Sequence, residues 1–532
     1  MELQKPEKGE IMGNYWMIPR NKRKLHPVVD VLSLFTLSST GIPWNGLAEQ
    51  RSFEDALEGF GLKRAGARRD MLAGGARTYE SWLNNLGLIF KETRTGLLRT
   101  TLAGDTLLSG EPPVPIITNQ LMKMQYPSPY SRRTNVSIDN RFRIRPFRFL
   151  LRLLLDTRIN QLTKKEIAYF AVTLGSNESN DCFEDVVQAI CDYRTYGVSS
   201  LPHNMDVLYP SRTGVKSIPE TLKRLEDVAN TFINYLQYTQ LIARVKETGE
   251  PEFITIPSHL RDEVSSILND GSSVRNLDST HEFGAENFQR SFGLAPGQNR
   301  DNRSFSTQPV SVTAYRDRRV RGEVLHIYSR RPVVNINADL IDEVASLTGY
   351  TNLEVEEALH GFSPNPVSQF EANYLDMSVS GRARATEFEI ATKEIFEALG
   401  FAGQHTGMYP RHPDVFVESP QGYSGILDTK AIKRYSPSND EKNRMISNYI
   451  PTYRTQHANL EFFMYIADSF GINYVNGIQD ITLASNLDGS GITAYNLLRL
   501  LNNHLNNPIS HTDLKVLLRS NTAISVTDID AL

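Results

Sequence analysis

Residues 412–435, HPDVFVESPQGYSGILDTKAIKRY, decide how the C-terminal part of this chain is interpreted. The stretch holds two apolar runs of strand length, and three charged residues lie among them: Asp414, Asp428 and Lys430. Charged side chains are costly to bury without partners, so their place beside apolar strand residues marks a candidate functional site. Alternate residues of a strand share a face, so Asp428 and Lys430 project together. Asp414 reaches the same face if the two strands pair.

The surrounding segments predict an α/β domain with a mixed sheet. TEFEIATKEIFEALG, residues 386–400, has apolar residues at helical spacing and a glycine at its end. NLEFFMYIA, residues 459–467, is almost continuously apolar and predicts a central strand. Helix and strand alternate through about the last 150 residues, which is typical of this fold class.

Two aspartates that converge on one point repel each other unless a cation lies between them, and oxygen-only ligands favour a hard ion such as Mg²⁺. Such an ion beside Lys430 is suited to hydrolysing a phosphodiester by in-line attack. The alternative is an ordinary ion pair between Asp428 and Lys430 on an exposed strand. The apolar neighbours Ile426 and Leu427 make that alternative less favourable.

The N-terminal part is basic and the remainder acidic. Residues 1–150 carry 22 Lys and Arg against 14 Asp and Glu, whereas residues 151–532 carry 35 against 47. This asymmetry predicts a polyanionic partner for the N-terminal part, with uneven solvation charge as the alternative. Residues 78–108 and 222–257 each read as a helix followed by two strands around a glycine, the tail of a winged helix. Winged helices often read DNA, although they also serve protein contacts or architecture.

The most basic stretch, with seven arginines and one acid, begins at Arg132 and Arg133. Further along it Arg141, Arg143 and Arg145 alternate with apolar residues, so they would share one face of an extended segment. Arginine makes forked contacts to phosphate and to guanine. We therefore predict that these five arginines bind DNA; a solvated arginine face is the alternative.

The length of 532 residues predicts several domains in a multidomain α+β protein. The composition suggests winged-helix-like recognition domains at residues 1–135 and 136–270, a linker and small helical connector at 271–375, and the mixed-sheet domain at 376–532. The sequence contains neither a membrane-length apolar run nor a signal peptide. The two cysteines fit neither a zinc site nor a disulfide framework. These features predict a cytoplasmic protein.

Two resemblances to known families cover most of the chain. FEIATKEIFEALGFAGQHTGMYPRHPDVFVESPQGYSGILDTKAIKRY resembles the cleavage domain of FokI-type type IIS restriction endonucleases, which belong to the PD-(D/E)xK nuclease superfamily. RTYESWLNNLGLIF, GLLRTTLAGDTLL, NQLMKMQYPSPYS and LEDVANTFINYLQYTQL resemble the AlwI-type restriction endonucleases and their nicking relatives. The first resemblance implies that Asp414 and Asp428 are metal ligands and that Lys430 is the catalytic lysine. It also implies that Glu389 helps to hold the metal, although Thr386-x-x-Glu389 equally fits a capping box.

The expected function is that of a type IIS-like restriction endonuclease. It would recognise a short asymmetric sequence in double-stranded DNA and cut at a fixed distance outside it, with Mg²⁺ as cofactor. The alternatives are a strand-specific nicking endonuclease of the same family and a non-catalytic winged-helix DNA-binding regulator. The resemblance further implies a companion DNA methyltransferase.

A transient homodimer through the cleavage domain is also expected. Met445, Tyr449 and Ile446 would form its apolar contact, on a helix that Pro451 limits to roughly three turns. Packing of these residues on their own sheet is the alternative.

Overall fold

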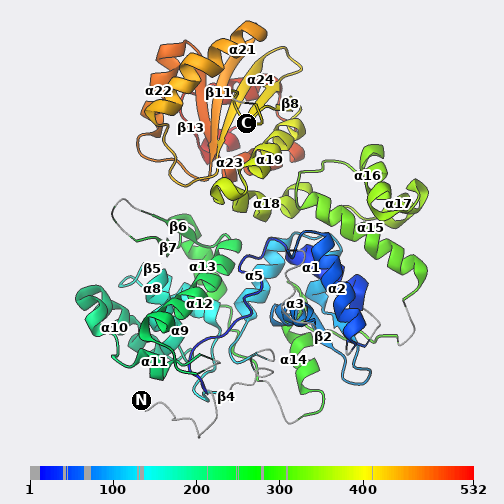
Figure 1. Cartoon of the computed structure of the whole chain (residues 1–532), viewed down its shortest axis with the longest axis vertical. Helices are drawn as coiled ribbons and strands as arrows, with labels where there is room; N and C mark the ends of the chain where they lie inside the picture. The colour runs from blue at the N-terminus through cyan, green and yellow to red at the C-terminus, as the bar shows by residue number, and fades with distance from the viewer. Residues whose placement is uncertain are drawn as a thin grey trace. The chain divides into compact units, whose positions relative to one another are not determined.

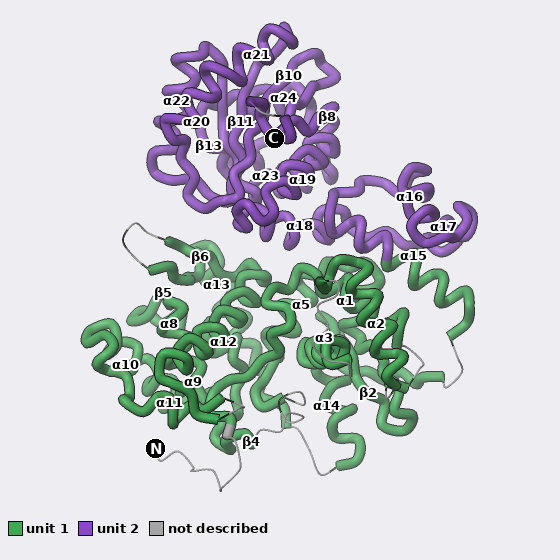
Figure 2. The backbone as a smooth tube through the Cα atoms, viewed as in Figure 1, with its two compact units in different colours: residues 1–322 green, residues 323–532 purple. Residues whose placement is uncertain are grey.

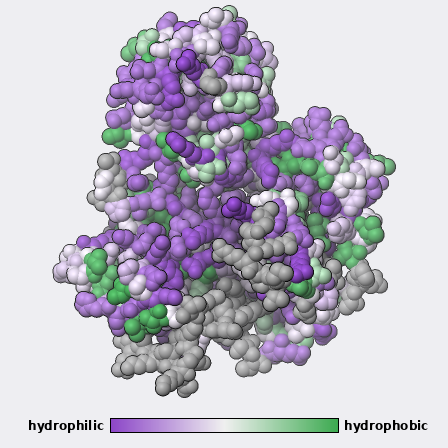
Figure 3. Space-filling model, viewed as in Figure 1, coloured by the Kyte–Doolittle hydropathy of each residue, from purple (hydrophilic) through white to green (hydrophobic). Residues whose placement is uncertain are grey.

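The computed structural model describes residues 12–39, 43–44, 46–64, 73–128, 131, 137–211, 214–246, 249, 251–276, 281–306, 310–409 and 411–532. The chain divides into two compact units, residues 1–322 and 323–532 (Figure 2). Hydrophilic residues cover most of the face seen in Figure 3, with small hydrophobic patches between them. Among the described residues no helix has the length and apolar character needed to cross a membrane.

Unit 1 is mainly helical and contains short strands (Figure 1). Its longer helices are α1 (Val28–Ser39), α2 (Leu47–Gly59), α3 (Gly74–Asn85), α4 (Leu102–Leu108), α5 (Pro113–Lys123), α7 (Pro146–Leu155), α10 (Asn180–Tyr196), α12 (Ile218–Tyr238), α13 (Arg261–Leu268) and α14 (Gly284–Phe292). Shorter turns are α8 (Lys164–Glu166), a π-turn (Ile167–Ala171), α9 (Val172–Leu174) and α11 (Met205–Leu208). The strands are β1 (Met12–Gly13), β2 (Ile89–Lys91), β3 (Leu98–Thr100), β4 (Ser137–Ile138), β5 (Gln161–Thr163), β6 (Ala243–Val245) and β7 (Phe253–Thr255).

Both helix-and-hairpin units predicted from the sequence are present in unit 1. Helix α3 leads into the antiparallel pair β2–β3, in which Phe90 lies opposite Arg99. Helix α12 leads into β6–β7, and β5 pairs with the other side of β7. The apolar stripe of α12 is buried, as the helical spacing of Leu225, Phe232 and Leu236 predicts.

Part of the segment predicted to be a linker, after residue 270, forms helix α14, which packs on the first hairpin. Gln289 donates one hydrogen bond to the carbonyl of Asn84 (2.7 Å) and another to that of Ile89 (3.1 Å). Phe288 and Phe292 are buried. With so few apolar residues the segment shows little periodicity in the sequence, and contacts with distant backbone hold it in place.

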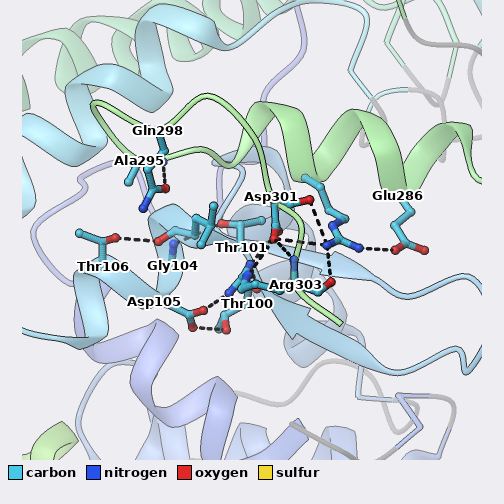
Figure 4. A network of polar contacts seen from close by, with 12 residues as sticks. Thr100, Thr101, Gly104, Asp105, Thr106, Glu286, Ala295, Gln298, Asp301 and Arg303 are labelled. Atoms are coloured by element: carbon cyan, nitrogen blue, oxygen red, sulfur yellow. Dashed lines mark hydrogen bonds and ion pairs between the residues drawn. The ribbon is translucent and has the colours of Figure 1, made fainter. Parts of the chain in front are cut away.

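An ion-pair network fixes the chain that follows α14 (Figure 4). The carboxylate of Asp301 accepts from Arg303 at 2.9 Å and from Arg290 at 3.2 Å. Although burial opposes this, the two arginines lower the pKa of Asp301 to about 2. Arg303 also pairs with Asp105, and Arg290 pairs with Glu286 at 3.2 Å. The network ties this segment to the residues that follow β3.

Helix α15 (Val312–Tyr328) contains the boundary between the units. The helices of unit 2 are α16 (Ala338–Thr348), α17 (Asn352–Leu359), α18 (Pro366–Met377), α19 (Ala385–Ala398), α20 (Asn439–Arg444), α21 (Ile450–Gln456), α22 (Tyr474–Ser485), α23 (Ala494–Asn506), α24 (His511–Leu518) and α25 (Val526–Asp530). Its strands are β8 (Ala402–His405), β9 (Val415–Glu418), β10 (Ser424–Lys430), β11 (Leu460–Ala467), β12 (Asp488–Thr493) and β13 (Ala523–Ile524).

The six strands of unit 2 form one mixed sheet in the order β13-β12-β11-β10-β9-β8. Strands β8, β9 and β10 are antiparallel neighbours, whereas β10 to β13 run parallel. The apolar strand β11 lies centrally, as its composition predicts. One buried cluster joins the sheet to α18, α19, α23 and α24, and another joins its other face to α21 and α22. The α/β fold with a mixed sheet predicted for this part of the chain is confirmed.

The helix after β10 is longer than the sequence predicts. It runs from Asn439 through a π-helical turn at Met445–Tyr449 and ends at Gln456. Pro451 lies at the first turn of α21, directly after the π-turn, where its missing amide hydrogen can be accommodated. The proline therefore does not stop the helix.

Candidate active site

The hairpin β9–β10 brings the two aspartates of the opening motif to one place. Leu427 pairs with Val415 in an antiparallel register. Asp428, which follows Leu427, therefore lies across from Asp414, which precedes Val415. Asp428 and Lys430 share a face of β10, because one residue separates them. The predicted pairing of these strands is confirmed.

Two hydrogen bonds from Thr429 hold the carboxylate of Asp414 in place. Its Oδ2 accepts a hydrogen bond from the Thr429 backbone amide at 2.6 Å and from the Thr429 hydroxyl at 2.9 Å. Both bonds come from the residue between Asp428 and Lys430. The first aspartate is thereby fixed relative to the second aspartate and the lysine.

Lys430 is the cation at the centre of the site. Its Nζ donates to Oδ1 of Asp428 at 2.8 Å and lies 3.8 Å from Oε1 of Glu441. Burial lowers the pKa of Lys430, but Asp428, Asp414 and Glu441 together raise it above its ordinary value. The ammonium therefore stays charged at neutral pH.

The electrostatics of Asp414 are those of a carboxyl crowded by like charge. Burial, followed by the nearby charges of Asp428 and Glu389, raises its pKa well above the ordinary value, and Lys430 opposes the shift only in part. A cation placed between the carboxylates would relieve both the desolvation and the repulsion. The site therefore fits a divalent metal bound through Asp414 and Asp428, whose oxygen donors suit a hard ion.

Glu389 does not close the start of its helix. Helix α19 begins after Arg384, and Thr386 lies inside the helix and forms no cap. The Oε2 atom of Glu389 instead forms a hydrogen bond with Nε2 of His405 on β8 at 2.8 Å. A Cβ added at Gly407 would lie 2.6 Å from the same oxygen, so the glycine leaves room for the carboxylate. The capping-box interpretation is wrong.

His405 flanks the site in the sequence, where it is expected to be a turn residue, but it ends strand β8 and contacts Glu389. Its ring joins the edge strand β8 to α19 across 16 positions of sequence. No short motif pairs these two positions, so only the fold reveals the contact. In the part of the chain that the structure describes, no group of three or more His, Cys, Asp or Glu side chains lies close enough together to hold a metal ion.

Two tyrosines enclose the lysine. The Nζ atom of Lys430 lies 5.9 Å from the ring centre of Tyr435 and 6.0 Å from that of Tyr465. Both rings are fully buried. Burial raises the pKa of both tyrosines, so the hydroxyls stay neutral. The aromatic faces stabilise the ammonium while keeping bulk water away from it.

The arginines predicted to bind DNA lie in different environments. Arg145 is buried and bonds Glu178 through Nε (2.8 Å) and Nη2 (2.6 Å). Arg141 is half-buried and donates to the carbonyls of Asn14 and Thr173. Arg143 alone of the three is exposed. The prediction that they share one open face is therefore wrong, and Arg143 is the one that a ligand could reach.

Arg132 and Arg133, the other two arginines of that prediction, lie outside the described residues.

The apolar residues predicted to pair two cleavage domains are part of the core of unit 2. Met445 and Tyr449 are buried in the cluster between the sheet and α21–α22, and Ile446 packs against it. The exposed side of the same helix is polar, with Asp440 and Arg444 forming an ion pair at 3.3 Å. The alternative, packing on their own sheet, is confirmed for these residues.

Two parts of the chain each match a family of known proteins. Residues 349–525 match the family described as FokI, cleavage domain, and residues 113–221 match the family described as type II restriction endonuclease HgaI, N-terminal domain. The first match contains Asp414, Asp428, Lys430 and Glu389.

A search of curated proteins gave no significant match. Two solved structures of restriction endonuclease FokI are 12% identical to the chain, each with a TM-score of 0.28. The alignment with the first structure covers 94% of this chain and 98% of the FokI chain. The alignment with the second, FokI bound to DNA, covers 87% of this chain and 84% of the FokI chain.

Proposed function

We propose that this chain, a site-specific nuclease with domains of the type IIS restriction endonucleases, recognises a short asymmetric DNA sequence and cuts at a fixed distance outside it. The observation that carries the proposal is the convergence of Asp414, Asp428 and Lys430 on adjacent strands inside the FokI-type domain. Carboxylates paired with a buried lysine are suited to phosphodiester hydrolysis.

Nuclease domains of this type use divalent metal ions, and we propose Mg²⁺ for this one. Asp414 and Asp428 would hold the ion through their carboxylate oxygens, and Glu389 would contribute by orienting a water. The ion supplies Lewis-acid polarisation of the phosphoryl group. Lys430 offsets the negative charge that develops on the reacting phosphate, and Tyr435 and Tyr465 keep its ammonium in place.

DNA recognition is assigned to the N-terminal part of the chain. The units α3–β2–β3 and α12–β6–β7 support winged-helix-like modules, within recognition domains at residues 1–135 and 136–270. Helix α14, in the segment expected to be a linker, packs on the first hairpin and belongs with the recognition part. The remainder of residues 271–375 would connect that part to the cleavage domain at 376–532. The exposed Arg143 belongs to the second recognition domain and is the first candidate for a DNA contact. Arg132 and Arg133 remain candidates from the sequence.

Cutting both strands requires two cleavage sites or a reorientation of one. We propose a transient homodimer of cleavage domains through the exposed side of α20, in place of the apolar contact expected from the sequence. Asp440 and Arg444 are one turn apart and opposite in charge. In a two-fold interface Asp440 of each copy can meet Arg444 of the other. A nicking enzyme, which cuts one strand, is the second candidate function.

The test is cleavage of a sequenced plasmid or phage DNA in Mg²⁺, followed by mapping of the ends. Ends at one fixed offset from a shared asymmetric sequence are the expected result. Nicks confined to one strand at that offset would favour the nicking enzyme. Sequence-specific binding without any cut would favour the non-catalytic regulator. DNA from cells that express a companion methyltransferase should resist cleavage.

A further inference from the structure

Unit 1 contains a hollow of about 420 Å³ along one side of α14. Its lining includes Gly284, Asn287, Phe288 and Ser291, which recur at helical spacing and so share one face of α14. Arg275 forms another part of the wall. The opposite face of α14 is bonded to the first hairpin through Gln289, so the helix that lines the hollow is anchored.

Arg275 is held in a fixed position at this hollow. The side chain of Gln125 donates to the Arg275 carbonyl and accepts from its amide, both at 2.9 Å. The Nε of Arg275 donates to Ser291 at 3.2 Å. These bonds orient the backbone and one edge of the guanidinium. Its two terminal nitrogens form no hydrogen bond with the residues that the structure describes.

A second cation, Lys123, lies close to Arg275. Its Nζ donates to the carbonyl of Leu294 at 2.7 Å. Burial, followed by the charge of Arg275, lowers the pKa of Lys123 to about 7. Burial and the nearby Arg145 also lower the pKa of Arg275.

Neither Lys123 nor Arg275 forms an ion pair with an acid among the described residues. The guanidinium of Arg275 stays charged, and a partly buried charge without a counter-charge weakens the folded protein and gains most from an anionic ligand. The other desolvated arginines nearby differ in this respect. Arg145 is paired with Glu178, and Arg148 is paired with Asp270.

We propose that the hollow beside α14 binds a backbone phosphate of the DNA duplex, with the guanidinium of Arg275 as the direct donor. Arg275 offers a planar fork suited to phosphate, and Asn287 and Ser291 supply further polar groups at the wall. This inference rests on the proposed function, because it makes the recognition part of a DNA-cleaving enzyme the place where the contact occurs.

The test measures binding of the full chain to a duplex in EDTA, which prevents cutting, at several salt concentrations. Arg275→Gln should weaken binding and reduce the slope of log K against log salt by about 0.9, the value for one lost phosphate contact. Arg158→Gln is the matched control, because Arg158 already pairs with Asp156 and Glu184. It should leave the slope unchanged.

Thermal unfolding separates a binding role from a structural one. Arg275→Gln removes an uncompensated charge, so its Tm without DNA should equal or exceed that of the wild type. A lower Tm with an unchanged salt slope would overturn the proposal in favour of a structural role. An unchanged slope with an unchanged Tm would also overturn it.

A third arm distinguishes DNA from free phosphate. If inorganic phosphate raises the Tm of the wild type but not of Arg275→Gln, and the DNA salt slope is the same in both, the site binds a free anion and the DNA assignment is wrong. If the wild type fails to cleave DNA in Mg²⁺, the proposed function is contradicted. Failure of the phosphate site and failure of the nuclease assignment therefore give different results.

Discussion

The ammonium of Lys430 lies 2.8 Å from Asp428 and 3.8 Å from Glu441. The second carboxylate comes from the start of α20, where its other oxygen accepts hydrogen bonds from the Ser438 amide (2.9 Å) and hydroxyl (2.8 Å). One glutamate thus closes a helix and faces the lysine of the site. If Asp428 binds a metal ion, Glu441 would be the carboxylate that still holds Lys430.

Glu441→Gln is therefore expected to slow cleavage about fivefold, since a partly exposed ion pair contributes up to about 1 kcal/mol. The glutamine oxygen still caps the helix, so stability should change little. Ser438→Ala is the control: it should lower stability by about 1 kcal/mol through the lost cap and leave the single-turnover rate unchanged. Equal cleavage rates for Glu441→Gln and wild type would rule out this role.

The raised pKa of Asp414 predicts how stability and cleavage depend on pH. In the metal-free protein the folded state favours protonated Asp414, so this group's contribution to stability is present at low pH and is lost as pH rises through the raised pKa. In EDTA the Tm should fall with rising pH, and less steeply in Asp414→Asn. With limiting metal, cleavage should instead accelerate with pH, because metal binding competes with the proton. A Tm that rises with pH to the same extent in both proteins would contradict the assignment.

The contact between Glu389 and His405 gives a test of whether Glu389 acts at the metal. His405→Ala should raise the metal concentration needed for half-maximal cleavage about tenfold, which is typical for loss of a group that orients a ligand. His412→Ala is the control, because His412 bonds Tyr453 (3.0 Å) rather than a carboxylate of the site. Titration of cleavage with Mg²⁺ measures both. Identical titrations for the two variants would assign the contact to packing.

Replacing Arg143 and Arg145 by alanine should have different effects on stability and on DNA binding. Arg145→Ala leaves Glu178 without its partner and should cost roughly 3 kcal/mol of folding free energy. Arg143→Ala should leave stability unchanged and reduce the salt slope of DNA binding by about 0.9. Chemical denaturation and binding at several salt concentrations provide the two readouts. A stable Arg145→Ala protein with a reduced slope would restore the original prediction for Arg145.

The proposed pairing of cleavage domains can be tested by exchanging charges on α20. Arg444→Glu should leave mostly nicked circles, and adding Asp440→Arg should restore double-strand cutting, because the two positions would meet in a two-fold interface. Met445→Glu is not a test of pairing, since it places a charge in the core and should lower the Tm. Full double-strand cutting by Arg444→Glu at limiting enzyme would exclude this interface.

Much of the cleavage domain could be predicted from the sequence, because the information is local. The period-two pattern of GILDTK places Asp428 and Lys430 on one face, and the apolar strand at residues 460–467 identifies the centre of the sheet. The environment of the arginines could not be predicted, because their partners are distant in sequence. Arg145 pairs with Glu178, 33 residues further on. The contact between Glu389 and His405 likewise depends on how a helix packs against an edge strand.

The length of the helix after β10 was not predicted, because regular α-helical spacing does not include the π-turn at Met445–Tyr449 that directly precedes the turn with Pro451.

The most direct test of the account compares the wild type with Asp428→Asn and Lys430→Met on a DNA that contains the mapped site. In Mg²⁺ the wild type should cut, and both variants should bind the site within a few-fold of the wild type without cutting it. Cleavage by Asp428→Asn at the same position and a similar rate would contradict the assignment of this site as the active centre.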